Sequence, residues 1–410
     1  MRGKITVDTL PSALGGLRVI EVAQLAAGPF CGKLLADLGA EVIKVEPPGS
    51  GDVARRRGPF PDDRPDPDAS GSFLYFNTNK LGVTADVTTG EGRALLRELL
   101  ANADLLIHDL QPEQAAAWHL DYASLALHCP RLVVTTITPF GTTGPWADFK
   151  GDGMHAAHAG GEAYLLPAGA EWLDRPPVKP GGLVTDCDAG VFAATGSLAA
   201  IYHQRATGKG QHVDCSKQEA VLNLCRAILG KFTAYGVVES RGTRRRRLGN
   251  NVRCRDGYIE FMALNDPLWE RIGAMMGGPA WCSAPDYQTT ASRSRHIDEV
   301  NDRVEEWAAE HTRAEIYARA RAIRAPVGRV ATADEIFTSP HLSDRGFFAE
   351  VEHPATGVTT YPGAPYRLSE TPWRVKRPAP RLGEHNALVF GERLGHSSQE
   401  LVHLRQLGVI

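Results

Sequence analysis

The chain has 410 residues, of which 43% are hydrophobic and 23% charged, and its formal net charge is −3. It has no run of 18 apolar residues and no signal-peptide core, so we expect no transmembrane helix and a cytoplasmic location. The near-neutral charge argues against a nucleic-acid binder, and seven scattered cysteines without a C-x-x-C pair argue against a disulfide framework and a zinc ribbon. The histidines show no ligand spacing, so no metal site is expected.

The first 150 residues alternate between strand and helix patterns. Helices are predicted over 30–39 and from the capping box Thr88-x-x-Glu91 to about residue 101. The predicted strands are 17–22, 41–46, 83–87, 105–108 and 132–137. This alternation predicts an α/β fold with an open parallel sheet and helices on both faces. Because the G-x-G-x-x-G fingerprint and the Walker-type loop are absent, the first turn does not indicate a nucleotide site.

The rest of the chain is less regular. Residues 151–190 are rich in Gly, Ala and Pro, and Pro372–Pro380 reads as an extended connector. The further predicted elements are helices at 188–205, 217–232 and 296–311 and a strand at 258–263.

Asp186 is the most informative residue, because an apolar run delivers it to the point where a helix of small residues begins. One interpretation is that Asp186 caps this helix. The other is a nucleophilic carboxylate, since a helix N-terminus favours the ionised form and only the anion attacks. Asp188 competes for either role, and spacing alone does not separate the two.

Several segments in chain order resemble the family III CoA-transferases (CaiB/BaiF), the group of formyl-CoA transferase and carnitine CoA-transferase. The segments are Gly28-Pro29-Phe30, Leu34–Glu46, Gly51–Arg55, Asn79-Lys80, Asp186 with Gly190, Thr207–Asp214, Ala325–Gly328, Arg345–Phe348 and Leu382–His385. Each is weak alone, but together they extend over most of the chain.

The resemblance implies a large Rossmann-like domain built from both chain ends, a smaller α/β domain, and an interlocked homodimer. The expected divisions are 1–225 for the first part of the large domain, 226–249 for a linker, 250–330 for the small domain, and 331–410 for a linker and the return to the large domain. It also implies that Asp186 carries CoA between carboxylic acids, through an acyl-aspartyl anhydride and an aspartyl-CoA thioester. The CoA thioester is then a substrate, and no tightly bound cofactor is expected.

The resemblance further implies a substrate and CoA site. Its residues are Gln24, Leu25, Ala26, Arg55, Asn79, Lys80, Asp109, Leu110 and Thr138. Tetrahedral intermediates need an oxyanion hole, which backbone N–H groups supply best. The turn with Ala26 and Ala27 is the first candidate, and Gly160-Gly161 is the second.

Five positions depart from well-known members: Pro47 replaces an Arg, Ala117 a basic residue, Asp109 an Asn, Leu110 a Phe, and Thr138 a Lys. Fewer cations would weaken phosphate binding. The Arg241–Arg255 segment holds seven arginines, and Arg244 in it is a candidate for the missing contacts. The alternative for this run is a solvated charged loop.

Three other functions remain open. Asp186 could transfer an acyl group with a non-CoA carrier or acceptor. The chain could be an α-methylacyl-CoA racemase, although the His-Asp pair of that group reads Gly151-Asp152 here, which leaves His155 and His158 as substitutes. Finally, it could be an inactive paralogue that pairs with an active one.

Overall fold

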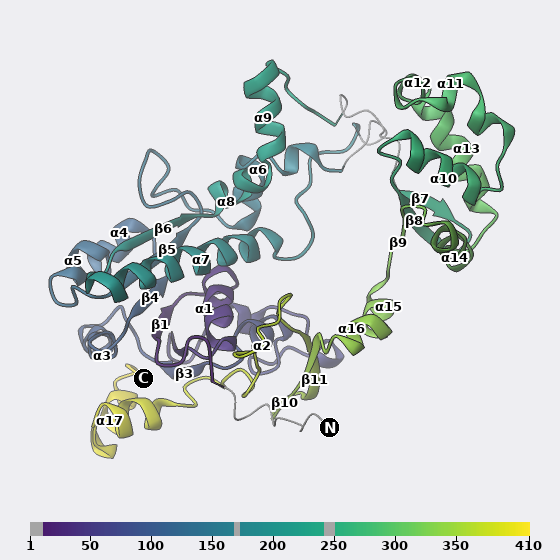
Figure 1. The fold of residues 1–410 in the computed structure, drawn as a ribbon. Helices are drawn as coiled ribbons and strands as arrows, with labels where there is room; N and C mark the ends of the chain where they lie inside the picture. The colour runs from purple at the N-terminus through teal and green to yellow at the C-terminus, as the bar shows by residue number, and fades with distance from the viewer. Residues whose placement is uncertain (1–10, 168–172, 242–250) are drawn as a thin grey trace. The chain divides into compact units, whose positions relative to one another are not determined.

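The computed structural model describes residues 11–167, 173–241 and 251–410. The chain forms two compact units (Figure 1). One falls within Met1–Leu166, Pro177–Val238 and Gly346–Ile410, and the other within Pro167–Pro176 and Glu239–Arg345. The first unit therefore draws on segments from both halves of the chain.

A six-stranded parallel sheet forms the centre of the first unit, which confirms the predicted α/β class. Its strands are β1 (Arg18–Val22), β2 (Glu41–Glu46), β3 (Leu81–Thr84), β4 (Leu105–His108), β5 (Val133–Thr138) and β6 (His212–Ser216). The spatial order is β3-β2-β1-β4-β5-β6. The winding direction reverses between β1 and β4, and open parallel sheets bind ligands where the carboxyl ends of such strands diverge.

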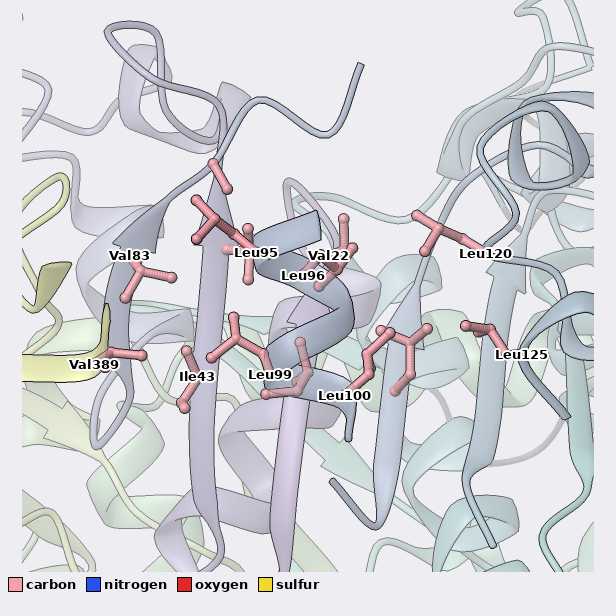
Figure 2. Packing of buried hydrophobic residues seen from close by; sticks show 14 of the residues in the cluster. Val22, Ile43, Val83, Leu95, Leu96, Leu99, Leu100, Leu120, Leu125 and Val389 are labelled. Atoms are coloured by element: carbon pink, nitrogen blue, oxygen red, sulfur yellow. The ribbon is translucent and has the colours of Figure 1, made fainter. Parts of the chain in front are cut away.

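The two faces of the sheet bury alternate residues of each strand. On one face, Ile43 and Val83 pack with the leucines of α3 (Gly90–Leu100) and with Val389 near the C-terminus (Figure 2). On the other face, Val42 and Leu105 pack with α1 (Ala27–Asp37) and α7 (Val184–Thr207). Helices therefore cover both faces, as the sequence predicts.

Helix α3 begins one residue later than predicted. Its N-cap is Thr89, whose hydroxyl accepts a hydrogen bond from the Gly92 N–H at 3.0 Å. The predicted cap, Thr88, instead donates its hydroxyl to Asp86 at 2.6 Å. The capping box Thr88-x-x-Glu91 is therefore wrong, because the loop that follows β3 uses Thr88 for its own turn.

Helices α1 and α7 pack closely because α7 has no side chain at Gly190. A Cβ at Gly190 would lie 2.8 Å from the Ala27 carbonyl oxygen. Helix α7 starts at Val184, four residues before the predicted start, and ends at Thr207, with Gly208 as its C-cap in a left-handed backbone conformation at φ 75°.

The helix predicted at 217–232 is broken in two. Cys225 separates α8 (Lys217–Leu224) from α9 (Arg226–Tyr235) and is the C-cap of the first and the N-cap of the second. The other elements of this unit are η2 (Val53–Arg56), η3 (Pro61–Asp63), α2 (Gly71–Phe76), α4 (Pro112–Ala117), α5 (Tyr122–Ala126), α6 (Gly153–Ala159), η4 (Ala163–Leu165), β10 (Phe348–His353), β11 (Gly357–Pro362), η7 (Ala387–Arg393) and α17 (Ser398–Gln406).

The second unit has its own antiparallel sheet in the order β7-β8-β9 and a separate core around Trp269. The predicted amphipathic helix at 296–311 is α13, which buries Val300 and Val304. The elements are β7 (Asn251–Cys254), β8 (Gly257–Phe261), α10 (Asp266–Met275), η6 (Ala280–Ser283), α11 (Pro285–Gln288), α12 (Thr290–Arg295), α13 (Ile297–Ala309), α14 (Arg313–Ile323), β9 (Val327–Arg329), α15 (Ala333–Phe337) and α16 (Pro340–Asp344).

Candidate active site

Asp186 lies in the first turn of α7, and its carboxylate faces an ammonium group. The Lys217 Nζ donates a hydrogen bond to Asp186 Oδ1 at 2.6 Å, and the Asp186 side chain is only 5% exposed. The N-cap position belongs to Leu183, which makes no side-chain cap bond. The capping interpretation of Asp186 is therefore wrong, because Asp186 lies inside the helix and pairs with a lysine.

Lys217 reaches Asp186 because strand β6 ends beside the start of α7. Ser216 is the last residue of β6 and the N-cap of α8, where its hydroxyl accepts from the Glu219 N–H at 3.2 Å. Lys217 is the first residue of α8 and lies next to the sheet edge. Lys217 was not predicted as a site residue. Strand β6 was not predicted either, so the sequence showed Lys217 only as the start of the helix expected at 217–232.

Gly153, the first residue of α6, leaves the space that the Asp186 carboxylate fills. A Cβ at Gly153 would lie 2.3 Å from Asp186 Oδ2. Asp152 caps this helix, and its carboxylate accepts from the Met154 N–H at 2.9 Å and pairs with His155 Nδ1 at 2.9 Å. Gly153 was not predicted as a site residue, since a glycine in a Gly/Ala-rich segment carries no specific pattern.

The two histidines considered for a racemase have local partners in α6. His155 forms the capping box with Asp152, and His158 Nδ1 lies 2.8 Å from the Met154 carbonyl oxygen, to which it donates. Burial raises the pKa of the neighbouring Cys187 thiol to about 12, with the Asp186 and Asp188 carboxylates adding to the rise. Cys187 is therefore a protonated thiol at neutral pH and a poor nucleophile.

The turn after β1 lies at the reversal point of the sheet and is fixed by carboxylates from two other segments. The Gln24 N–H donates to Asp109 Oδ2 at 2.8 Å, and the Leu25 N–H donates to Asp52 Oδ1 at 2.8 Å. Leu25 adopts a left-handed backbone with φ 67°. These bonds hold Gln24 and Leu25 in one conformation just before α1 begins.

Asp109 follows β4 and lies within the electrostatic range of the same lysine. Burial raises the pKa of Asp109 to about 6, while the Gln24 N–H and the Lys217 ammonium oppose the rise. Lys217 thus acts on two carboxylates, Asp186 by direct contact and Asp109 through space. Gln24 and Asp109 are therefore joined by a hydrogen bond, and Lys217 links Asp109 to Asp186 through its charge.

Three other predicted binding residues have interior partners. Arg55 pairs with Glu46 at 2.7 Å, and Lys80 pairs with Glu21 at 2.7 Å, with both cationic side chains fully buried. The Asn79 side chain donates to Asp37 and to the Arg374 carbonyl oxygen. These partners lie in β1, β2, α1 and the C-terminal segment, and none of them is Asp186 or Lys217. Their interactions tie the sheet to the returning end of the chain.

The remaining predicted positions lie around the sheet. Leu110 is buried in the core beneath α3, and Thr138 ends β5 with its hydroxyl buried and without a hydrogen-bond partner among the described residues. Arg244 lies outside the described residues.

The two candidate oxyanion sites differ in the state of their N–H groups. Ala26 and Ala27 begin α1, and the first N–H groups of a helix have no partner within it. By contrast, the Gly160 N–H donates to Ala156 at 2.7 Å and the Gly161 N–H donates to His158 at 3.2 Å. The start of α1 is therefore the better candidate, because its first backbone N–H groups are not used within the helix, whereas those of Gly160 and Gly161 are already bonded.

The described residues contain neither a membrane span nor a metal cluster. No helix in this part of the chain is both long and apolar enough to cross a membrane. No group of three or more His, Cys, Asp or Glu side chains within the same ranges is arranged to hold a metal ion.

Comparison with known proteins identifies relatives along nearly the whole chain. The model of CoA-transferase family III matches residues 14–386. The chain is 33% identical to succinyl-CoA–D-citramalate CoA-transferase of Chloroflexus aurantiacus, over 98% of each chain. It is also 33% identical to succinate–glutarate CoA-transferase of Agrobacterium fabrum, over 92% of this chain and 95% of that one. Formyl-CoA:oxalate CoA-transferase of Rhodopseudomonas palustris is 30% identical over 98% of each chain.

The fold is also similar to that of a solved structure. A CaiB/BaiF family protein from Brucella suis superposes with a TM-score of 0.82 at 28% identity, covering 93% of this chain and 99% of that one.

Proposed function

The chain belongs to CoA-transferase family III, and from this membership we propose that it transfers CoA between two carboxylic acids through Asp186. The observation that carries the assignment is the Asp186 carboxylate, 5% exposed and 2.6 Å from the Lys217 ammonium. The ion pair holds this carboxylate in a fixed position. A carboxylate oxygen is a nucleophile that can form a covalent intermediate with an acyl group.

The proposed reaction begins with attack of an Asp186 oxygen on the thioester carbonyl of the donor. A C–O bond forms, the C–S bond breaks, and the electron pair leaves with sulfur as the CoA thiolate. The thiolate then attacks Cγ of Asp186, which gives an aspartyl-CoA thioester and frees the donor carboxylate. The acceptor carboxylate repeats both steps in reverse, so no proton is gained or lost over the cycle.

Each attack places negative charge on a carbonyl oxygen that must be stabilised. We assign this role to the N–H groups of Ala26 and Ala27, because α1 begins there and the preceding turn is held by Asp109 and Asp52. The positive end of the α1 dipole adds to the same effect. Gly160 and Gly161 are the weaker candidates, because their N–H groups are already bonded.

The substrate site is assigned to the reversal point of the sheet. Gln24, Leu25 and Asp109 line it from β1 and β4, and the Thr138 hydroxyl at the end of β5, unpartnered within the described residues, is a polar group for a ligand. The names of the relatives include succinyl-CoA, glutarate and oxalate. We therefore propose a dicarboxylic acid thioester as the donor, with succinyl-CoA as the first compound to test.

For the assembly we propose what the family resemblance implies, which is a large domain built from both chain ends and an interlocked homodimer. The proposed location is the cytoplasm. The C-terminal Val409 and Ile410 are buried in the core beneath α3, which supports the use of both ends. Helix α9 supports a partner copy, because none of its residues is buried and Phe232 and Tyr235 are 56% and 80% exposed. Surfaces of this kind usually bind another protein.

The test is a panel of acyl-CoA donors and carboxylate acceptors with the wild type, Asp186→Asn and Asp188→Asn. We expect transfer by the wild type, loss of transfer in Asp186→Asn, and retention in Asp188→Asn as the neighbouring control. Hydroxylamine added during turnover should convert Asp186 to a hydroxamate that peptide mass spectrometry locates.

Full activity of Asp186→Asn would overturn the assignment. Trapping at Asp186 that occurs only with a donor lacking CoA would instead favour the non-CoA carrier. Uptake of deuterium at the α-carbon of a 2-methylacyl thioester in D2O, without CoA exchange, would favour the racemase.

A further inference from the structure

Lys217 loses its ion-pair partner when Asp186 reacts. Its Nζ lies 2.6 Å from Asp186 Oδ1, and its side chain is only 13% exposed. Within the described residues, Asp186 is its single ion-pair partner. The resting pair thus places one positive and one negative charge in a nearly dry space.

Acylation of Asp186 removes the negative member of this pair. A carboxylate bears a charge, whereas an anhydride or a thioester bears none. An ammonium group left without a counter-ion in a poorly hydrated space is strongly disfavoured. Asp109 does not take over this role by direct contact, because its carboxylate accepts from the Gln24 N–H and acts on Lys217 only through space. The acylated site therefore attracts an anion.

Building on the proposed function, we propose that Lys217 binds the carboxylate of the acceptor acid whenever Asp186 is present as its CoA thioester. The ammonium holds one acceptor oxygen while the other attacks Cγ of Asp186. A C–O bond forms, the C–S bond breaks, and the electron pair leaves as CoA thiolate. One negative charge enters with the acceptor and one leaves on sulfur, so the net charge beside Lys217 stays constant.

This role predicts a preference of the acylated enzyme for anionic over neutral nucleophiles. A positioning role through Asp186 alone would not do so, since misplacing Asp186 would slow attack by every nucleophile. The two roles therefore separate in the ratio of the rates with a carboxylate and with a neutral nucleophile of similar size.

The experiment uses the full-length enzyme loaded with CoA at Asp186 by succinyl-CoA, as wild type, Lys217→Met and Lys217→Arg. Discharge of the thioester is then timed with succinate and, separately, with hydroxylamine. We expect Lys217→Met to slow the reaction with succinate roughly ten- to hundredfold, the effect of one charge-assisted hydrogen bond. The rate with hydroxylamine should stay nearly unchanged, and Lys217→Arg should restore most of the succinate rate.

Equal slowing with both nucleophiles, or no slowing with succinate, would overturn the proposal. If Lys217→Met does not load, the wild type decides the question, because nitrate should compete with succinate but not with hydroxylamine. The absence of such competition would then count against the role of Lys217. Failure of the wild type to form any thioester at Asp186 would refute the proposed function itself, which is a separate result.

Discussion

Gly153 lies so close to the Asp186 carboxylate that a methyl group on its Cα would meet Oδ2 at 2.3 Å. The first residue of α6 and the first turn of α7 thus meet with room for a hydrogen atom only. At the other carboxylate oxygen, Lys217 holds Oδ1 at 2.6 Å. A glycine and a lysine from different elements together fix both oxygens of the proposed nucleophile.

Gly153→Ala should lower transfer activity while leaving the fold intact. The new methyl group displaces the Asp186 carboxylate, and a misplacement of about 1 Å at a reacting group can reduce the rate roughly hundredfold. Stability should change little, because alanine is favourable at the start of a helix and a side-chain carboxylate can move. Steady-state kinetics and thermal unfolding measure the two effects.

The matched control for this change is Gly181→Ala, since a Cβ at Gly181 meets nothing within 4 Å. Gly181 lies five positions before Asp186 in the sequence and should tolerate the methyl group. Equal activity of the two variants would show that the contact between Gly153 and Asp186 does not position the nucleophile.

Gly190→Ala should destabilise the first unit. A Cβ there would lie 2.8 Å from the Ala27 carbonyl oxygen, so α1 and α7 must move apart. Overpacking of this kind reduces the free energy of unfolding by about 1–3 kcal/mol. Urea unfolding measures the change, and Gly90→Ala is the control because a Cβ at Gly90 meets nothing within 4 Å. A stability equal to that of the control would contradict the close packing.

Five of the six strands of the sheet were predictable because they are local hydrophobic patterns, whereas β6 (His212–Ser216) was missed because most of its residues are not buried. Strands β2 (Glu41–Glu46) and β4 (Leu105–His108) have the predicted bounds. The start of α7 was not predictable, since its N-cap, Leu183, makes no side-chain cap bond and leaves no signal in the sequence. Residues 184–187 belong to the helix, but they lie in a Gly/Ala/Pro-rich stretch with no helical pattern, so they were not predicted as helical.

The candidate site was only partly predictable because its contacts join distant segments. Asp186 stood out through its motif, whereas its pairing with Lys217 depends on how α7 connects to β6. Arg55 and Lys80 were predicted as ligand contacts from the resemblance. Their buried carboxylate partners, Glu46 and Glu21, come from strands β2 and β1, and no local pattern reveals such pairings.

Lys80→Met should reduce stability strongly. Lys80 Nζ lies 2.7 Å from Glu21 Oε2 and 2.8 Å from the Pro29 carbonyl oxygen, with the lysine side chain fully buried. Removing one partner of a buried ion pair typically reduces the free energy of unfolding by about 3–5 kcal/mol. Because Glu21 keeps its second cation, Lys44, at 3.0 Å, the loss should lie at the lower end of this range. Denaturant unfolding measures this, with the exposed Lys209→Met as the control. Unchanged stability together with a raised KM for the donor would restore Lys80 as a binding residue.

Asp109→Asn should stabilise the protein at neutral pH and have little effect in acid. Burial raises the pKa of Asp109 from 3.8 to about 6, so the folded protein holds this proton more tightly than the unfolded chain does. Between these two values the folded state binds more protons, and the free energy of unfolding therefore falls as the pH rises. Above the folded pKa the full penalty applies, on the order of 3 kcal/mol at 1.36 kcal/mol per pKa unit.

The amide that Asp109→Asn introduces carries no charge, and its oxygen can still accept the Gln24 N–H, so the variant escapes this penalty. The gain in unfolding free energy over wild type should be near zero at about pH 4 and reach about 1–3 kcal/mol at about pH 7.5. Urea unfolding at both values measures the gain, with the exposed Asp148→Asn as the control. A gain that is independent of pH, or larger in acid, would show that Asp109 is ionised in the folded protein and that its carboxylate is held by Lys217 rather than penalised by burial.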